Sequence, residues 1–319
     1  MSRYLVRRIL LAIPTLLLIS FVLFAILSLA PGDPLSQFAA NPAVPPEVRE
    51  NIRRALGLDQ PWPIRYVKWL WSMMHGDWGF SFGSRVAVWD LIKLRIPSTL
   101  AVVGIAYVVA LVLAIPIGIL SAVKQYSMFD HVATTFAFMG FSVPTFFTGL
   151  LLIIVLSVKF QLLPFIYDST LQVHDLSTLG AQIRQSIMPI TVLALFQTAV
   201  LVRYTRASML ENLPQDYVRT ARAKGLAESS VINRHVVRNS LIPVITLIAL
   251  TAPTVFSGAL ITEQIFRVPG IGSLLITSIQ NNDIPVIMAI TFTFSILVVL
   301  FNLVADVLYG VLDPRIRYD

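Results

Sequence analysis

Residues 9–30 read ILLAIPTLLLISFVLFAILSLA, twenty-two positions without one charged side chain. A helix of about 20 apolar residues is long enough to cross the ~30 Å hydrocarbon core of a bilayer. A basic segment precedes the run, as in a signal peptide, but the run is long and no small-x-small cleavage site follows it. We therefore expect a retained transmembrane helix here.

Comparable runs recur along the chain, which has 319 residues, 56% of them hydrophobic and only 13% charged. These values, with a mean hydropathy of +0.77, lie outside the range of soluble domains. The predicted fold class is an all-α membrane protein with six transmembrane helices. Prolines and glycines inside the runs, such as Pro116, Gly118 and Pro144, indicate tight packing first and hinges second. The further runs cover residues 98–123, 132–158, 187–206, 241–262 and 284–310.

Several chemistries are excluded by composition. The chain has no cysteine, which rules out disulfides, zinc–thiolate sites and iron–sulfur ligation. It also has no H-E-x-x-H motif for a zinc hydrolase. The formal net charge of +7 is spread over many connections and not over one soluble module. Membrane topology explains this charge better than nucleic-acid binding does.

The placement of arginine and lysine predicts the orientation. The short connections on the side of both termini hold most of these residues, so both termini are expected in the cytoplasm. Residues 31–97 also contain basic side chains, but segments longer than about 60 residues cross the membrane largely regardless of charge. The predicted organisation is a first helix within 1–30, an exoplasmic subdomain over 31–97, a transmembrane core over 98–310 with a cytoplasmic loop at 207–240, and a tail at 311–319. Within the subdomain we expect helices in 45–57, from Pro45 or Pro46 to Gly57, and in 61–76.

A polar, basic stretch, QDYVRTARAKGLAESS, occupies residues 215–230. Pro214 and Asp216 favour a helix start, and Gly225 suits a left-handed stop. A second helix is expected from Ser229 or Ser230. By shape alone, the stretch is equally consistent with a solvated basic loop that only satisfies the positive-inside rule.

The order of residues in this stretch is more specific than its predicted shape. The stretch DYVRTARAKGL at 216–226 resembles the cytoplasmic coupling motif of ABC importer permeases of the oligopeptide/dipeptide/nickel permease family, first-permease type. Arg219 and Thr220 stand where other ABC importers have glutamate and alanine, which favours the peptide branch. Further similar motifs are LAPGDP (29–34), LGLDQP (56–61), HGDWGFSF (75–82), RYTRASMLENL (203–213), LITEQIFRVPGIG (260–272) and VADVLYGVLDPRIRY (304–318).

This resemblance implies a transport subunit without catalytic residues, metal or cofactor of its own. It implies a bacterial or archaeal cytoplasmic membrane, a second homologous permease, two partner subunits that bind ATP and Mg, and an extracytoplasmic binding protein. The implied cargo is a di- or oligopeptide, although nickel chelates, glutathione and sugars are handled within similar families. The coupling residues would be Asp216, Tyr217, Arg219, Thr220, Ala221, Ala223, Lys224 and Gly225, with Tyr217 and Ala221 in a groove of the ATP-binding subunit.

A few other polar residues have two interpretations each. Asp306 and Arg203 either pair across the bundle or snorkel separately to the interface. Glu263 either lines the outer mouth or, as we favour, caps the turn before Pro269. Residues on a possible substrate path more often join helix to helix by hydrogen bonds. These are Ser142, Thr145, Gln197 and Thr251.

Two rival functions fit the sequence less well. An intramembrane protease would use Ser142 in GFS, but none of the four histidines lies inside another span to serve as its base. A secondary transporter would carry acidic ion sites near the midplane, often in two related halves. No span has a central acidic residue and no repeat is visible. Dependence on ATP instead of ion gradients would separate these readings.

Overall fold

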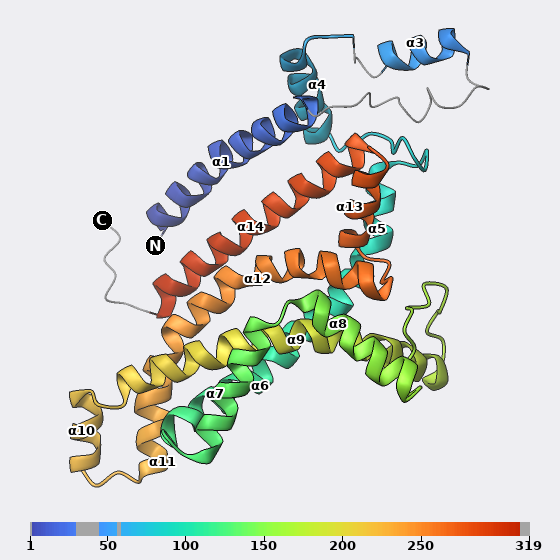
Figure 1. Cartoon of the computed structure of the whole chain (residues 1–319). Coiled ribbons are helices and arrows are strands. Elements are labelled where there is room, and N and C mark those ends of the chain that lie inside the picture. The colour runs from blue at the N-terminus through green and yellow to red at the C-terminus, as the bar shows by residue number, and fades with distance from the viewer. Residues whose placement is uncertain (1, 30–44, 56–58, 313–319) are drawn as a thin grey trace.

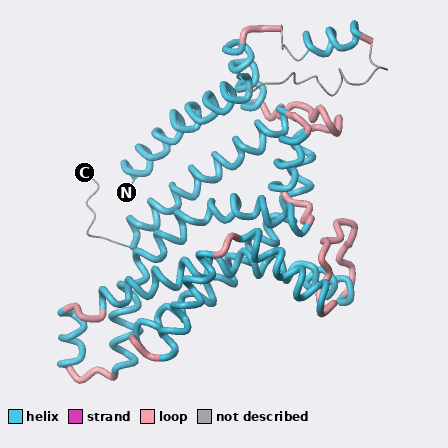
Figure 2. The backbone as a smooth tube through the Cα atoms, in the orientation of Figure 1, coloured by secondary structure: helices cyan, strands magenta, loops and turns pink. Residues whose placement is uncertain are grey.

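The computed structural model describes residues 2–29, 45–55 and 59–312. In this part of the chain the helices are joined by loops, and one isolated bridge links Phe80 and Ala87 (Figures 1 and 2). The elements in chain order are α1 Ser2–Leu29, α3 Pro46–Ala55, α4 Trp62–Met74, α5 Val88–Thr99, η1 Leu100–Gly104, α6 Ile105–Val123, α7 Met128–Ser142, α8 Thr145–Leu152, η2 Ile153–Lys159, α9 Leu176–Asn212, α10 Asp216–Ala223, α11 Glu228–Ser230, η3 Val231–Val237, α12 Arg238–Phe266, α13 Ile271–Gln280 and α14 Ile284–Leu312. The predicted all-α membrane class is confirmed.

The expected number of six spans lies within the range that the described helices allow. Among the described residues, five helices are long and apolar enough to cross a bilayer, and two bent helix pairs raise the possible number to seven. The run at 132–158 is not one helix, because α7 and α8 meet at 102°. Val143 between them is extended, with φ −86° and ψ 124°. An extended residue before Pro144 is expected, since the proline ring clashes with a helical predecessor and lacks an amide hydrogen.

The segment between the first two spans also departs from expectation. The helices predicted in 45–57 and 61–76 are present as α3, which starts at Pro46, and α4, whereas Gly57 lies outside the described residues. The helix of the second span begins at Val88 and continues through η1 into α6. The expected boundary at residue 97 therefore falls inside a continuous helical rod.

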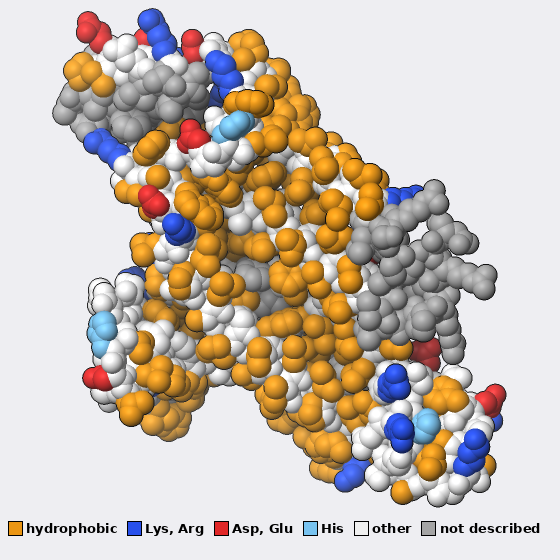
Figure 3. Space-filling model, turned by 180° about the vertical axis from the view of Figure 1, so that it is seen from behind, with side chains coloured by type: hydrophobic (Ala, Val, Ile, Leu, Met, Phe, Trp, Pro, Cys, Tyr) orange, Lys and Arg blue, Asp and Glu red, His pale blue; other side chains and the backbone are white. Residues whose placement is uncertain are grey.

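The long helix α9 is the centre of the bundle. It packs against α6, α7 and α12, and side chains on all sides of it are buried. A core cluster joins Met188, Val192 and Leu193 of α9 to Val102 and Phe266. Hydrophobic side chains cover the middle of the face shown in Figure 3, while charged side chains gather toward its ends. This is the distribution expected of a chain that spans a bilayer.

The helices α1 and α14 pack side by side (Figure 1), which places α1 next to Asp306 of α14. Arg8 of α1 lies 3.1 Å from the Asp306 carboxylate. Arg203 instead has its guanidinium 5.0 Å from the ring centre of Phe141 and 5.7 Å from that of Tyr204. Of the two interpretations, the Arg203–Asp306 pair is not formed, because Asp306 faces α1 while Arg203 contacts α7.

A close contact between α6 and α9 depends on Gly118. A Cβ at this position would lie 2.6 Å from the Thr205 Cβ on α9 and 3.0 Å from the Val202 carbonyl oxygen. We expect Gly118→Ala to lower the free energy of unfolding by about 1–3 kcal/mol, the usual cost of overpacking a core. Thermal unfolding of the purified chain in detergent measures this.

Gly104 provides the matched control, since nothing lies within 4 Å of its Cβ position. Gly104→Ala should leave the melting temperature unchanged or raise it, because alanine favours a helix by up to about 1 kcal/mol over glycine. Equal melting temperatures for the two variants would contradict the close approach of α6 and α9.

Candidate coupling site

A helical hairpin projects from one end of the bundle (Figure 1). It runs from the end of α9 through α10 and a tight turn into α11. The predicted helix is confirmed over Asp216–Ala223, and so is its stop, since Gly225 has φ +75°. The second helix begins at Glu228, one residue before Ser229.

The inner face of α10 is fixed by apolar packing. Val218 is completely buried and Ala221 is 5% exposed. An eight-residue helix is marginal alone in water, so this packing is what holds it in place. Ala221 faces the interior of its own chain and cannot at the same time fill a partner's groove. The surrounding buried side chains are Ala122, Met209, Val231 and Val236.

The turn of the hairpin is held by an ion pair. Arg222 donates from Nε to a Glu228 oxygen at 3.1 Å and from Nη2 to the other at 2.7 Å. The hydrogen bonds to Glu228 raise the pKa of Arg222. Both side chains are substantially exposed, so the pair orients α11 against α10 more than it stabilises the fold. Tyr217 donates a further hydrogen bond of 2.7 Å to the Asn212 amide oxygen.

The outer face of α10 is slender at its centre and charged at its ends. At 100° per residue, four positions lie opposite Val218 and Ala221. Small side chains occupy the middle of this face, and a weak 3.5 Å contact joins Arg219 to Asp216 across one edge. Tyr217 and Lys224 flank it. The four opposing residues, all exposed, are Asp216, Arg219, Thr220 and Ala223.

A buried ion pair lies in the bundle near the hairpin. Asp130, in the first turn of α7, accepts two hydrogen bonds of 2.7 Å from Arg206 of α9. It also accepts from the Tyr126 amide at 2.9 Å and from the hydroxyls of Ser121 and Thr134. The Asp130 side chain is only 3% exposed, and these donors satisfy it. The pair therefore joins α6, α7 and α9.

Sequence reasoning missed this pair, although a signal for it was present. Asp130 and Arg206 sit at the ends of apolar runs, where an ionisable side chain needs a partner. A second link, from the Ser208 hydroxyl to the Ser240 carbonyl oxygen at 2.8 Å, connects α9 to α12. The ends of α6, α7, α9 and α12 therefore form one unit with α10.

The residues of the predicted substrate path fall into two groups. Gln197 of α9 is buried and donates to the Thr251 hydroxyl of α12 at 3.2 Å. Ser142 and Thr145 lie at the break between α7 and α8. Stacking of Phe141 on Phe196, with ring centres 6.0 Å apart, brings the end of α7 beside α9 near Gln197.

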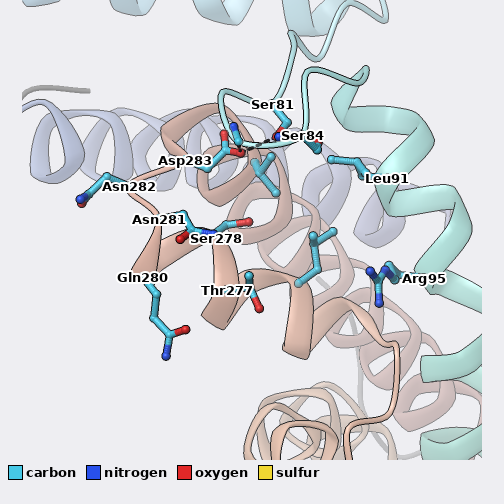
Figure 4. Close-up of a pocket in the computed structure, with 13 residues that line it drawn as sticks. Ser81, Ser84, Leu91, Arg95, Thr277, Ser278, Gln280, Asn281, Asn282 and Asp283 are labelled. Atoms are coloured by element: carbon cyan, nitrogen blue, oxygen red, sulfur yellow. Dashed lines mark hydrogen bonds between the residues drawn. The ribbon is translucent and has the colours of Figure 1, made fainter. Parts of the chain in front are cut away.

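At the opposite end of the molecule, a pocket of about 590 Å³ opens between α5, α13 and the loop before α5 (Figure 4). Asp283 forms its upper wall and accepts from the amides of Phe82 at 3.0 Å and Gly83 at 3.2 Å, and from the Ser81 hydroxyl. Arg95 reaches from α5 toward α13, and its buried Nε lacks a hydrogen-bond partner in the described chain.

Behind this pocket, Glu263 is completely buried. Its carboxylate accepts from the Thr99 hydroxyl at 2.7 Å and from the Ser273 amide at 3.0 Å, in the first turn of α13. A Cβ at Gly270 would lie 2.1 Å from this carboxylate, so a larger residue there would have to displace the Glu263 side chain. The sequence favours a cap of the turn before Pro269, whereas the side chain caps the first turn of α13, which follows Pro269.

Comparisons with known proteins agree with this architecture. Residues 114–318 match the family described as "Binding-protein-dependent transport system inner membrane component", and residues 1–103 match the corresponding N-terminal family. The chain belongs to this transport family. It is a multi-pass membrane transport component and not an enzyme.

Several curated relatives of this permease cover it along its whole length. The oligopeptide transport system permease protein AppB of Bacillus subtilis is 42% identical, with 100% of both chains covered. The dipeptide transport system permease protein DppB of Escherichia coli K12 is 39% identical, covering 100% of this chain and 99% of its own. A putative peptide transport system permease protein of Brucella abortus is 37% identical over both full lengths.

The buried ion pair of this permease should matter more than an exposed one. We expect Arg206→Ala to destabilise the chain by about 3–5 kcal/mol, because it leaves Asp130 buried and unpaired. Arg219→Ala, which removes the exposed contact to Asp216, should have little effect. Thermal unfolding in detergent compares the two variants. Similar melting temperatures would show that the ion pair of Asp130 and Arg206 does not stabilise the fold more than the exposed contact does.

Gly225 should be required for its backbone conformation alone, since nothing lies within 4 Å of its Cβ position. Gly225→Val should strain the turn by about 1–2 kcal/mol and accelerate hydrogen exchange of the α10 amides. Gly225→Asn, which tolerates positive φ, should exchange nearly as slowly as the unaltered protein. Equal exchange in the valine and asparagine variants would show that the stop does not hold α10.

Proposed function

We propose that this permease is one half of the pore of an ATP-driven, binding-protein-dependent importer of di- or oligopeptides, and that α10 couples it to an ATP-binding subunit. The observation that carries the coupling role is the two-sided construction of α10. Its inner face is anchored in the bundle by Val218 and Ala221, while its outer face is exposed and slender. The peptide cargo rests on the relatives, which are permease proteins of oligopeptide, dipeptide and peptide transport systems.

In the proposed complex, two permeases stand side by side and one ATP-binding subunit docks beneath each. ATP and Mg bind to those subunits, and this chain holds no cofactor. The outer face of α10, with Tyr217 and Lys224 at its flank, enters a groove of the ATP-binding subunit. Ala221 contributes to packing inside the permease instead. The hairpin end and both termini lie in the bacterial or archaeal cytoplasm, and a binding protein delivers cargo at the end that holds the pocket.

Motion of the groove would pass into the spans through the contacts of the hairpin. Val218 presses on the cluster that contains Ala122 and Met209, at the ends of α6 and α9. The ion pair of Asp130 with Arg206 then carries the displacement to α7. The break at Pro144 lets α7 move without α8, and the polar side chains of Ser142, Thr145, Gln197 and Thr251 are our proposed contacts along the cargo path.

A substitution on each face of α10 tests the coupling. Ala223→Trp places a large side chain on the exposed face, so it should fold normally yet lose the ATP-binding subunits when the complex is purified in mild detergent. Ala221→Trp should destabilise the hairpin itself, because Ala221 is buried. If Ala223→Trp retained the ATP-binding subunits and their transport-stimulated ATPase, the proposed docking face would be wrong.

Reconstitution of the unaltered complex in proteoliposomes separates the rival functions. With the binding protein present, uptake of a labelled dipeptide should require ATP and survive collapse of the ion gradients. Uptake by the permeases alone, driven by an ion gradient, would support a secondary transporter. ATP-dependent uptake of a nickel chelate in place of the dipeptide would overturn the proposed cargo and leave the coupling role intact.

A further inference from the structure

The helix α4 lies beside the end of α1 (Figure 1), and three of its aromatic side chains, Trp62, Tyr66 and Trp69, contact α1 or α14. The Tyr66 hydroxyl lies 2.9 Å from the Ser20 hydroxyl and donates to the Leu17 carbonyl oxygen at 3.3 Å. Trp62 and Phe21 have ring centres 5.5 Å apart. These contacts fix α4 against α1 and show at what depth it lies.

Two independent contacts place α4 below the outer ends of the spans. Ser20 lies nine residues before the end of α1 at Leu29, which is about 13 Å along a helix. Phe292, whose ring centre is 5.8 Å from that of Trp69, lies eight residues after the start of α14, or about 12 Å. The charge-free run of α1 matches the ~30 Å thickness of the hydrocarbon core. The inner face of α4 therefore meets α1 in the outer half of the bilayer, and not above it.

The opposite face of α4 carries a continuous apolar stripe. Its members recur at helical spacing and are strongly exposed: Ile64 by 48%, Val67 by 64%, Trp71 by 66% and Met74 by 74%. Soluble surfaces rarely carry such a row of large apolar side chains without a partner. Lys68 lies beside the row, and its long stem allows the ammonium group to reach the headgroups.

We propose that α4 is seated in the outer leaflet, with Ile64, Val67, Trp71 and Met74 against the lipid acyl chains. Lipid fits better than a protein partner for two reasons. The depth set by Ser20 and Phe292 is that of the hydrocarbon, and α1 itself presents exposed apolar side chains to the same layer, among them Leu18 at 64% and Ile26 at 59%. Tryptophan is also enriched near the lipid–water interface. Residues 61–75 are then a membrane-embedded element, and not part of an aqueous subdomain.

The absence of cysteine makes a direct test simple. Single cysteines are introduced as Val67→Cys and Trp71→Cys, with Val22→Cys in the middle of α1 as the lipid control. Gln172→Cys, in the exposed loop before α9, is the aqueous control. Each is labelled with a nitroxide in the full importer in nanodiscs, and collision rates with oxygen and with a water-soluble nickel chelate are measured by electron paramagnetic resonance.

The labels at 67 and 71 should collide preferentially with oxygen, as at 22, with an oxygen-to-nickel ratio several-fold above that at 172. A ratio equal to that at 172 would overturn the proposal, because the stripe would face water. Immobile labels that neither reagent reaches in the importer, but that oxygen reaches in the isolated chain, would also overturn it and assign the stripe to the second permease. Two labelled positions protect the result against misfolding of one variant, and the measurement does not depend on transport.

Discussion

A buried carboxylate needs hydrogen-bond donors from the protein around it, and Asp130 obtains them from several helices at once. It receives donors from α6, α7, α9 and the turn before α7, and no single helix could supply them. Removing Arg206 would leave Asp130, whose side chain is only 3% exposed, as a buried charge without its partner. This carboxylate therefore ties three helices together at the hairpin end.

The same requirement is met by different means at the two ends of the molecule. At the end that holds the pocket, Asp283 and Glu263 accept backbone amides, which ties a loop and a short helix to the spans. At the hairpin end, α10 uses apolar burial inward and leaves its polar groups on the exposed side. The pocket end is therefore fixed by polar contacts with the backbone. The hairpin is joined to the bundle by packed apolar side chains instead.

Local sequence predicted the elements well and their mutual contacts poorly. The helix over Asp216–Ala223 and the left-handed stop at Gly225 follow from backbone preference within a residue or two. The apolar runs locate the spans, but the helices extend beyond them, as α9 does at both ends. The size of the bend at Pro144 was not predicted, because residue propensities do not determine the angle between two helices. The partner of Asp306 depended on which helix lies beside α14, and the burial of Ala221 on how α10 is rotated about its axis. Both depend on how the helices of the folded chain pack against one another.

The contact between Glu263 and Gly270 has a consequence for how this permease can change over time. The carboxylate occupies the space that any side chain at position 270 would need. A larger residue at 270 would therefore move the Glu263 side chain, together with its hydrogen bonds to Thr99 and Ser273. The two positions should thus change together, because a shorter side chain at 263 would make room for one at 270.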